Sequence, residues 1–224
     1  FKDKKFGIFK FIKGKSKKVY SEKDCFEVGK IMANFHKINK NLINKHENSY
    51  SLNFWIRLFK EYRNSLNIII PGSQNIIEDE IKFLTKLWPR ELPKGIIHAD
   101  MFPDNVLFRS KEIPGIIDFY FSCYDFLSYD LAILINAWCF QNNKFNWRLA
   151  KQIIRGYESV RKITINEKKK FNILLRGACL RFLLTRVQDT KKCVDDKMLN
   201  IKNPVDFYER LLFHKNIRGN YDFF

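Results

Sequence analysis

The stretch GIIHADMFPDNVLFRSKEIPGIIDFYFSCYDFLSYDLA, residues 95–132, contains short apolar runs that lead directly into aspartate and asparagine residues. The runs GIIH, NVLF and IPGIID have the length of strands and are interrupted by the polar segment HADMFPD. Such runs, bounded by turn residues, indicate strands. We therefore expect residues 95–118 to form two or three short strands around a polar loop.

The polar residues of this stretch have the spacing of a phosphoryl-transfer site. His98, Asp100 and Asn105 give H-x-D-x-x-x-x-N, the spacing of a kinase catalytic loop, and Asp118 ends the next apolar strand. Transfer of a γ-phosphoryl group needs a carboxylate that accepts the proton of the acceptor hydroxyl, and oxygen ligands for Mg²⁺. A hairpin between Asn105 and Asp118 would bring their side chains to shared metal ions. The ring of His98 is expected to pack under the loop.

Helical periodicity dominates the rest of the chain. Ser21 is a suitable N-cap for the first helix, because acidic residues follow it in the first turn and apolar residues then recur up to about Asn39. Further helices are expected over residues 52–66, 76–87, 126–140, 146–160, 166–190 and 204–214. The prediction is an α+β protein, mostly helical, with a small sheet that carries the polar loop.

Composition limits the classes of partner. The chain has 224 residues, 46% of them hydrophobic, and a net charge of +17 that is spread along its whole length. We interpret this charge as a solvated basic surface and expect no nucleic-acid partner. Five widely spaced cysteines without a C-x-x-C pair indicate reduced thiols. Without a long apolar run or a signal-peptide core, we expect a cytoplasmic protein with no membrane partner.

Several segments resemble the aminoglycoside phosphotransferase and choline kinase superfamily, and within it the homoserine kinases of the choline-kinase-like type. The resemblance runs from about residue 6 to 214 and rests on the segments HADMFPDNVLF (98–108), GIIDFYFSCYD (115–125), YDLAILINAWCF (129–140), RGYESVRKIT (155–164) and RGACLRFLLTRVQD (176–189). The H-x-D-x-x-x-x-N pattern is shared by the superfamily. The IDFYF, N-x-W-C and R-F-x-L-T-R-x-x-D patterns are similar to those of homoserine kinases.

The resemblance implies a fold and an activity. The fold would be protein-kinase-like, with residues 15–224 forming the helical C-terminal lobe and its catalytic hairpin, and residues 1–14 forming the last N-lobe strand and the hinge. The activity would be ATP-dependent phosphorylation of L-homoserine to O-phospho-L-homoserine, a step of threonine biosynthesis, with Mg²⁺ as cofactor.

The resemblance also implies roles for individual residues. Asp100 would be the catalytic base, and Asn105 and Asp118 the Mg²⁺ ligands. Asp130 would brace the catalytic loop by accepting its backbone N–H groups. The segment FIKG at residues 11–14 would be the hinge that meets adenine, which makes its first two side chains, Phe11 and Ile12, candidates for the adenine slot.

Residues that bind the acceptor are proposed from its chemistry. Homoserine carries a carboxylate, which an arginine fork binds well, and an ammonium, which acids or carbonyls bind. Arg181 and Arg186 are the candidates for the carboxylate. The candidates for the ammonium are Asp104, Asp125 and Asn136. For each of them a purely structural role, such as a surface salt bridge, remains the alternative.

The N-terminus carries a further expectation. FGIFKFIKG predicts a strand over residues 6–12, and no glycine-rich loop or strand lysine precedes it. We expect that an N-terminal part of the kinase is missing and that the chain as given binds ATP poorly. Two alternatives stay open: a kinase for an aminoglycoside, choline or ethanolamine, and a catalytically inactive, truncated binding module. The basic charge suits a carboxylate-bearing acceptor better than a polycation, and the presence of Asp100, Asn105 and Asp118 argues against an inactive module.

Overall fold

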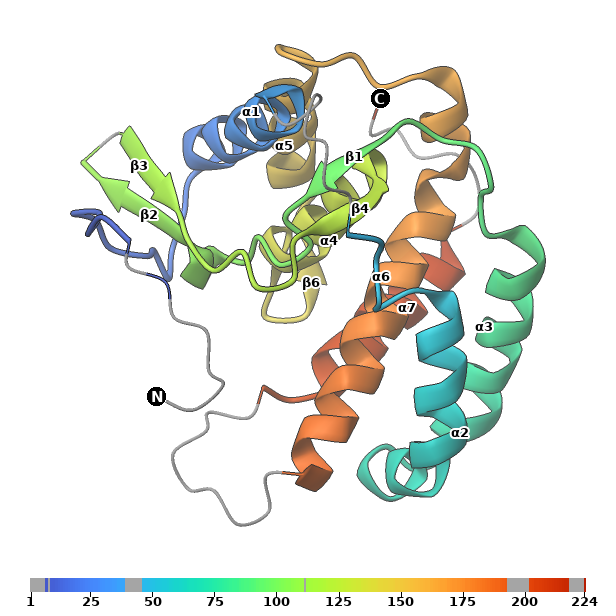
Figure 1. Ribbon diagram of the computed structural model, residues 1–224. Helices are drawn as coiled ribbons and strands as arrows, with labels where there is room; N and C mark the ends of the chain where they lie inside the picture. The colour runs from blue at the N-terminus through green and yellow to red at the C-terminus, as the bar shows by residue number, and fades with distance from the viewer. Residues whose placement is uncertain (1–6, 8, 39–45, 111, 193–201, 218–223) are drawn as a thin grey trace.

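The computed structural model describes residues 7, 9–38, 46–110, 112–192, 202–217 and 224. Helices make up most of this part of the chain, and the strands are short (Figure 1). In chain order the elements are α1 (Glu22–Ile38), α2 (Leu52–Ile69), α3 (Ser73–Leu87), β1 (Lys94–Ile97), the 3-10 turn η2 (Pro103–Asn105), β2 (Val106–Arg109), β3 (Glu112–Ile116), β4 (Cys123–Phe126), α4 (Leu127–Trp138), β5 (Phe140–Gln141), β6 (Lys144–Phe145), α5 (Trp147–Glu158), α6 (Ile165–Lys192) and α7 (Val205–Asn216). The predicted mostly helical α+β class is confirmed.

Helix α6 forms the long axis of the molecule. Helices α2, α4 and α7 pack along it, and α3 lies against α2 at the edge (Figure 1). Every residue of α4 is buried, which fits its largely apolar sequence, because a helix that is hydrophobic on all sides belongs in a core. Helix α4 contacts both β1 and β4, the two strands of one antiparallel pair.

Helices α1 and α5 lie side by side and approach closely through two glycines (Figure 1). A Cβ atom on Gly29 would overlap the backbone of Ile153, and one on Gly156 would overlap the carbonyl of Phe26. Only a residue without a side chain fits at these two crossing points. Helix α1 starts as predicted at the N-cap Ser21, whose hydroxyl accepts the N–H of Asp24 at 3.2 Å.

The strands form three antiparallel pairs in the described part of the chain. β1 pairs with β4, and β2 pairs with β3 in the hairpin expected between Asn105 and Asp118. The hairpin closes with the N–H of Ile117 donating to the carbonyl of Asn105 at 3.0 Å. A third small hairpin joins β5 to β6.

The strand predicted over residues 6–12 is wrong for the positions that the structure describes. Gly7 and residues 9–14 have no regular secondary structure, and the first ladder contact is an isolated bridge between Lys15 and Phe108. The rings of Phe9 and Phe11 are 88% and 83% exposed. Alternating aromatic residues form a strand only beside a partner strand, and the described residues provide no partner before Lys15. Phe6 and Ile8 lie outside the described residues.

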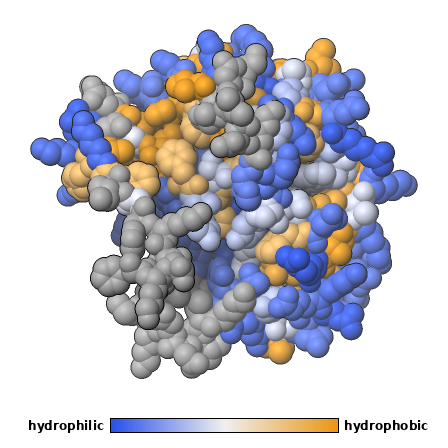
Figure 2. All heavy atoms as spheres, in the orientation of Figure 1, coloured by the Kyte–Doolittle hydropathy of each residue, from blue (hydrophilic) through white to orange (hydrophobic). Residues whose placement is uncertain are grey.

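Hydrophilic side chains cover most of the face in Figure 2, and separate hydrophobic patches interrupt them. No helix in the described segments is both long and apolar enough to cross a membrane. Four of the cysteines are buried and unpaired, namely Cys25, Cys123, Cys139 and Cys179. The fifth, Cys193, and the helix end expected at Asn39 lie outside the described residues.

Candidate active site

The catalytic loop, residues 98–102, connects the end of β1 to the turn η2. Its sharpest bend is at Ala99, which has a φ of 62°, in the left-handed region that residues with a side chain rarely adopt. After this bend the N–H of Asp100 donates to Nδ1 of His98 at 3.2 Å. At the far end of the loop, the indole N–H of Trp138 donates to the carbonyl of Met101 at 2.9 Å.

Asp130 of α4 supports the loop from beneath. Its two carboxylate oxygens accept the N–H groups of His98 and Ala99, each at 2.8 Å. One of these oxygens also lies 3.0 Å from Nε2 of His36 on α1. These are the backbone contacts that the resemblance implied for Asp130. Burial alone would raise the pKa of this carboxyl, but the hydrogen bond and charge of His36, with His98, hold the pKa below its usual value.

A buried chain of polar groups continues from His36. Its Nδ1 atom lies 2.8 Å from the hydroxyl of Tyr157 on α5, and the guanidinium of Arg161 donates to the same hydroxyl at 3.2 Å. Arg161 also pairs with both oxygens of Glu167 on α6. No role was predicted for these residues from the sequence. The one available signal was His36, a polar residue at a position where the helical periodicity of α1 predicts burial.

Asn105 is tied to Asp100 by its amide nitrogen. The Nδ2 atom donates to the backbone carbonyl of Asp100 at 2.8 Å and to its carboxylate at 3.2 Å. The amide oxygen is therefore the atom of Asn105 that can ligate a metal. Asp118 lies at the other end of the hairpin, is exposed, and has a φ of 64°.

The donor set fits Mg²⁺ that is shared with a nucleotide. Mg²⁺ commonly binds through one or two protein oxygens together with water and substrate phosphates. Within the described residues no group of three or more His, Cys, Asp and Glu side chains could hold a metal on its own. Asn105 and Asp118 at the two ends of one hairpin are an incomplete set of this kind, and phosphate oxygens would complete it.

The surroundings of Asp100 raise the pKa of its carboxyl group. Burial raises its pKa, the positive charges of Arg181 and Lys202 lower it, and the neighbouring acids Asp118 and Asp104 raise it again. The resulting pKa is about 6. A carboxylate with a pKa near 6 is ionised at neutral pH and is a better proton acceptor than an ordinary aspartate.

His98 is fully buried beneath the loop, as expected. Its Nε2 atom lies 3.1 Å from the carbonyl of Ile117, and its ring centroid lies 4.8 Å from that of Phe119. These contacts connect the catalytic loop to the segment that carries Asp118. The position of His98 therefore agrees with a structural role beneath the loop.

The two arginines proposed for the carboxylate of the acceptor make different contacts. Arg181 is 2% exposed, and its guanidinium donates to the carbonyl of Ala99 at 2.8 Å. Arg186 donates to the carbonyl of Asn203 at 2.7 Å and pairs with Asp206 at 3.3 Å, which fixes the start of α7. Both guanidinium groups are bound to the protein itself.

The three candidates for the ammonium of the acceptor are not brought together. Asp104 is exposed, beside the loop, and pairs with Lys202 at 2.8 Å. Asn136 is fully buried, and its amide is bonded to the carbonyl of Leu175 and to His214, so its side chain makes core contacts. The competing core contacts of Asn136 are long-range, and a sequence pattern does not reveal them.

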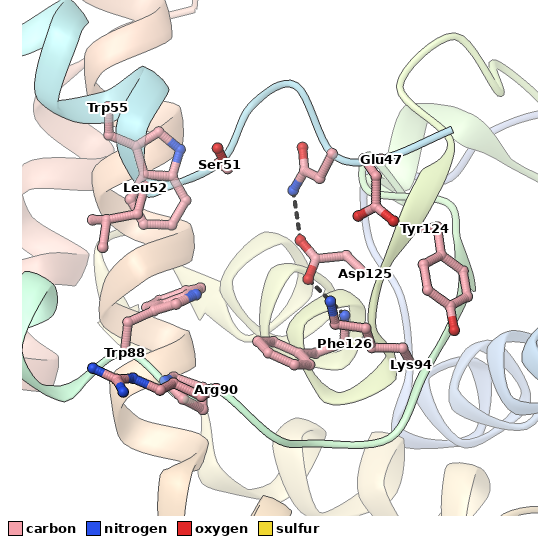
Figure 3. A pocket seen from close by; sticks show the side chains of 12 residues that line it. Glu47, Ser51, Leu52, Trp55, Trp88, Arg90, Lys94, Tyr124, Asp125 and Phe126 are labelled. Atoms are coloured by element: carbon pink, nitrogen blue, oxygen red, sulfur yellow. Dashed lines mark hydrogen bonds between the residues drawn. The ribbon is translucent and has the colours of Figure 1, made fainter. Parts of the chain in front are cut away.

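Asp125 lines a separate pocket of about 270 Å³ (Figure 3). One of its oxygens accepts the amide of Asn48 at 2.7 Å, and the other accepts the N–H of Phe126 at 2.7 Å. The pocket also involves Lys94, which begins β1, whereas the catalytic loop follows the other end of that strand. Asp125 is thus removed from Asp100 by the length of β1.

The candidates for the adenine slot lie near the N-terminus. The ring of Phe11 is exposed, and Ile12 is half-buried against Gly115 of β3, where a Cβ atom would overlap it. Ile12 therefore contacts the hairpin that leads to Asp118.

Comparisons with known proteins bear on the family and the fold of the chain. Residues 2–163 match the family described as "Phosphotransferase enzyme family". A homoserine kinase of Beijerinckia indica is 39% identical over 211 residues, which cover 94% of this chain and 66% of that protein. A homoserine kinase of Rhodospirillum rubrum is 38% identical over 218 residues, which cover 97% of this chain and 68% of that protein. The chain thus spans about two thirds of the length of these curated relatives.

Solved structures of similar fold include an ethanolamine kinase from Plasmodium vivax, with a TM-score of 0.66 and 16% identity, covering 94% of this chain and 66% of that one. A choline kinase from Cryptosporidium parvum also has a TM-score of 0.66, with 18% identity, 92% coverage of this chain and 68% of that one. At such low identity these structures support the fold alone.

Proposed function

Because the chain belongs to the phosphotransferase enzyme family, we propose that it carries the catalytic lobe of an ATP-dependent kinase that phosphorylates the hydroxyl group of L-homoserine. The observation that carries the proposal is the arrangement of Asp100, Asn105 and Asp118 at one loop and hairpin, with Asp130 fixing the loop backbone. The product would be O-phospho-L-homoserine, a precursor in threonine biosynthesis.

The residues divide the reaction between them. Asp100 accepts the proton of the acceptor hydroxyl while the hydroxyl oxygen forms a bond to the γ-phosphorus of ATP. The bond from that phosphorus to the bridging oxygen of ADP breaks at the same time. Asn105 and Asp118 would hold Mg²⁺, which supplies charge neutralisation for the phosphate oxygens. Asp130 keeps the backbone of residues 98 and 99 in place during the reaction.

The charges that act on Asp100 favour an acceptor with a carboxylate. Arg181 and Lys202 are the two cations with the largest effect on its pKa. A polyamine such as an aminoglycoside, or a quaternary ammonium such as choline, has no anionic group for these cations to attract. Homoserine carries an anionic group that this charge attracts. The names of the curated relatives support the same acceptor.

The test is ADP release by the full-length gene product with ATP and Mg²⁺. The acceptors are L-homoserine, choline, ethanolamine and kanamycin, and the control is Asp100→Asn. We expect turnover on homoserine alone and a fall in kcat of about 10²- to 10⁴-fold in the variant, the usual contribution of a general base.

Turnover on one of the other three acceptors would keep the mechanism and remove homoserine as the substrate. No turnover on any acceptor, with a folded protein, would favour the alternative of an inactive binding module.

A further inference from the structure

The bend at Ala99 has a conformation that needs external support. An alanine in the left-handed region is less stable than in its ordinary conformations, because its Cβ crowds the following carbonyl. Such a residue persists where the surrounding structure fixes it. The bend lies immediately before Asp100, so it sets the direction in which that carboxylate points.

Ala99 is held on both of its peptide groups. Its N–H donates to Asp130 on α4, and its carbonyl accepts from the guanidinium of Arg181 on α6, each at 2.8 Å. These two partners come from different helices that pack against each other. The bend is thus held between a buried anion and a buried cation.

The guanidinium of Arg181 is enclosed by other groups. Three aromatic rings surround it, with centroids 5.3 Å from the guanidinium carbon for Tyr50, 5.5 Å for Phe121 and 4.7 Å for Phe182. Rings placed in this way stabilise a cation that has lost its water. With 2% of the residue exposed, no open face is left for a ligand of the size of homoserine.

We infer that Arg181 is a positioning residue, which holds the left-handed bend at Ala99 and thereby aims Asp100, and that it is not the ligand of the acceptor carboxylate. The inference rests on the proposed function, since it assigns Arg181 a role in that reaction. It replaces the substrate role for which Arg181 was one of two candidates.

The two roles predict different kinetics for Arg181→Met in the full-length protein. Loss of positioning lowers kcat by about 10- to 100-fold and leaves the KM for homoserine close to that of the wild type. Loss of a carboxylate ligand instead raises the KM with kcat retained. Arg181→Gln, which keeps an amide donor and most of the side-chain volume, is the second variant in case the first does not fold.

Hydrogen exchange provides a readout that does not depend on turnover. In Arg181→Met we expect faster amide exchange of residues 98–102 than in the wild type. The matched control is Arg176→Met, which removes a guanidinium from the same helix where it pairs with Glu80. This control is expected to lower stability without a selective effect on the loop.

A raised KM at unchanged kcat, or loop exchange equal to that of the Arg176→Met control, would overturn the inference. If the wild-type protein turns over none of the acceptors, the proposed function fails, and the exchange experiment still decides whether Arg181 holds the loop.

Discussion

The two sides of the catalytic loop are built in opposite ways. On the inner side, Asp130, His36 and Tyr157 are fully buried and bonded to one another in series. On the outer side, the hairpin presents Asp118 to solvent, and the side chain of Asn105 bonds to Asp100 through its amide nitrogen. The polar groups of the inner side bond to one another. On the outer side, the carboxylate of Asp118 and the amide oxygen of Asn105 are available to a metal ion.

The inner network runs without a break from Arg161 to Asp130. Arg161 donates to the hydroxyl of Tyr157, this hydroxyl lies 2.8 Å from Nδ1 of His36, and Nε2 of His36 lies 3.0 Å from a carboxylate oxygen of Asp130. Each buried group then has a partner, as burial of polar groups requires. The two sides therefore predict different effects. Changes on the inner side should lower the stability of the fold and, through the loop, the activity, whereas changes on the outer side should lower the activity alone.

The largest expected effect is on the outer side. Asp118→Asn should lower kcat by about 10³-fold, equivalent to about 4 kcal/mol of activation free energy, because a neutral amide neutralises the metal poorly. Asparagine tolerates the positive φ at this position, and the site is exposed, so the free energy of unfolding should change by less than about 0.5 kcal/mol. ADP release and urea denaturation measure the two quantities.

The control for Asp118→Asn is a titration with Mg²⁺. The variant should need more Mg²⁺ for half-maximal activity than the wild type, and removal of Mg²⁺ with a chelator should abolish turnover in both. Wild-type activity in the variant would mean that Asp118 does not serve the metal.

The next largest effect is expected on the inner side. The carboxylate of Asp130 accepts hydrogen bonds from two backbone N–H groups, and in Asp130→Asn an amide NH₂ group would face at least one of these donors. The exchange also leaves His36 without its anionic partner. We expect a loss of about 3 kcal/mol in the free energy of unfolding, together with a loss of activity. Denaturant unfolding measures the first effect.

The matched control for Asp130→Asn is Asp79→Asn, the same exchange at a side chain that is 73% exposed on α3. That variant should keep the stability of the wild type. Equal unfolding midpoints for the two variants would remove the proposed division between the sides of the loop.

The smallest effect tests how far the inner network extends. Tyr157→Phe deletes one hydroxyl between His36 and Arg161 and should lower the free energy of unfolding by about 1 kcal/mol, with little change in KM. The comparison variant is Tyr120→Phe, at a residue that is 82% exposed near Asp118. A Tyr157→Phe variant as stable as Tyr120→Phe would show that the network ends at His36.

The sequence predicted the local features well. Helix periodicity, the N-cap at Ser21 and the hairpin that joins Asn105 to Asp118 depend on residues close in the chain, and all three are present. The strand predicted over residues 6–12 is absent at the described positions, Gly7 and residues 9–12, because a strand depends on a distant partner.

The sequence by itself predicted which groups the proposed chemistry would use. The spacing from His98 through Asp100 and Asn105 to Asp118 lies within one short segment, so the loop and hairpin follow from local structure. Only the tertiary structure decided which side chains support that segment. His36 and Asp130 are 94 positions apart, and Arg181 reaches Ala99 across 82 positions. Such pairings depend on how helices pack, and a buried arginine that holds a backbone carbonyl has the same sequence pattern as one that binds a substrate.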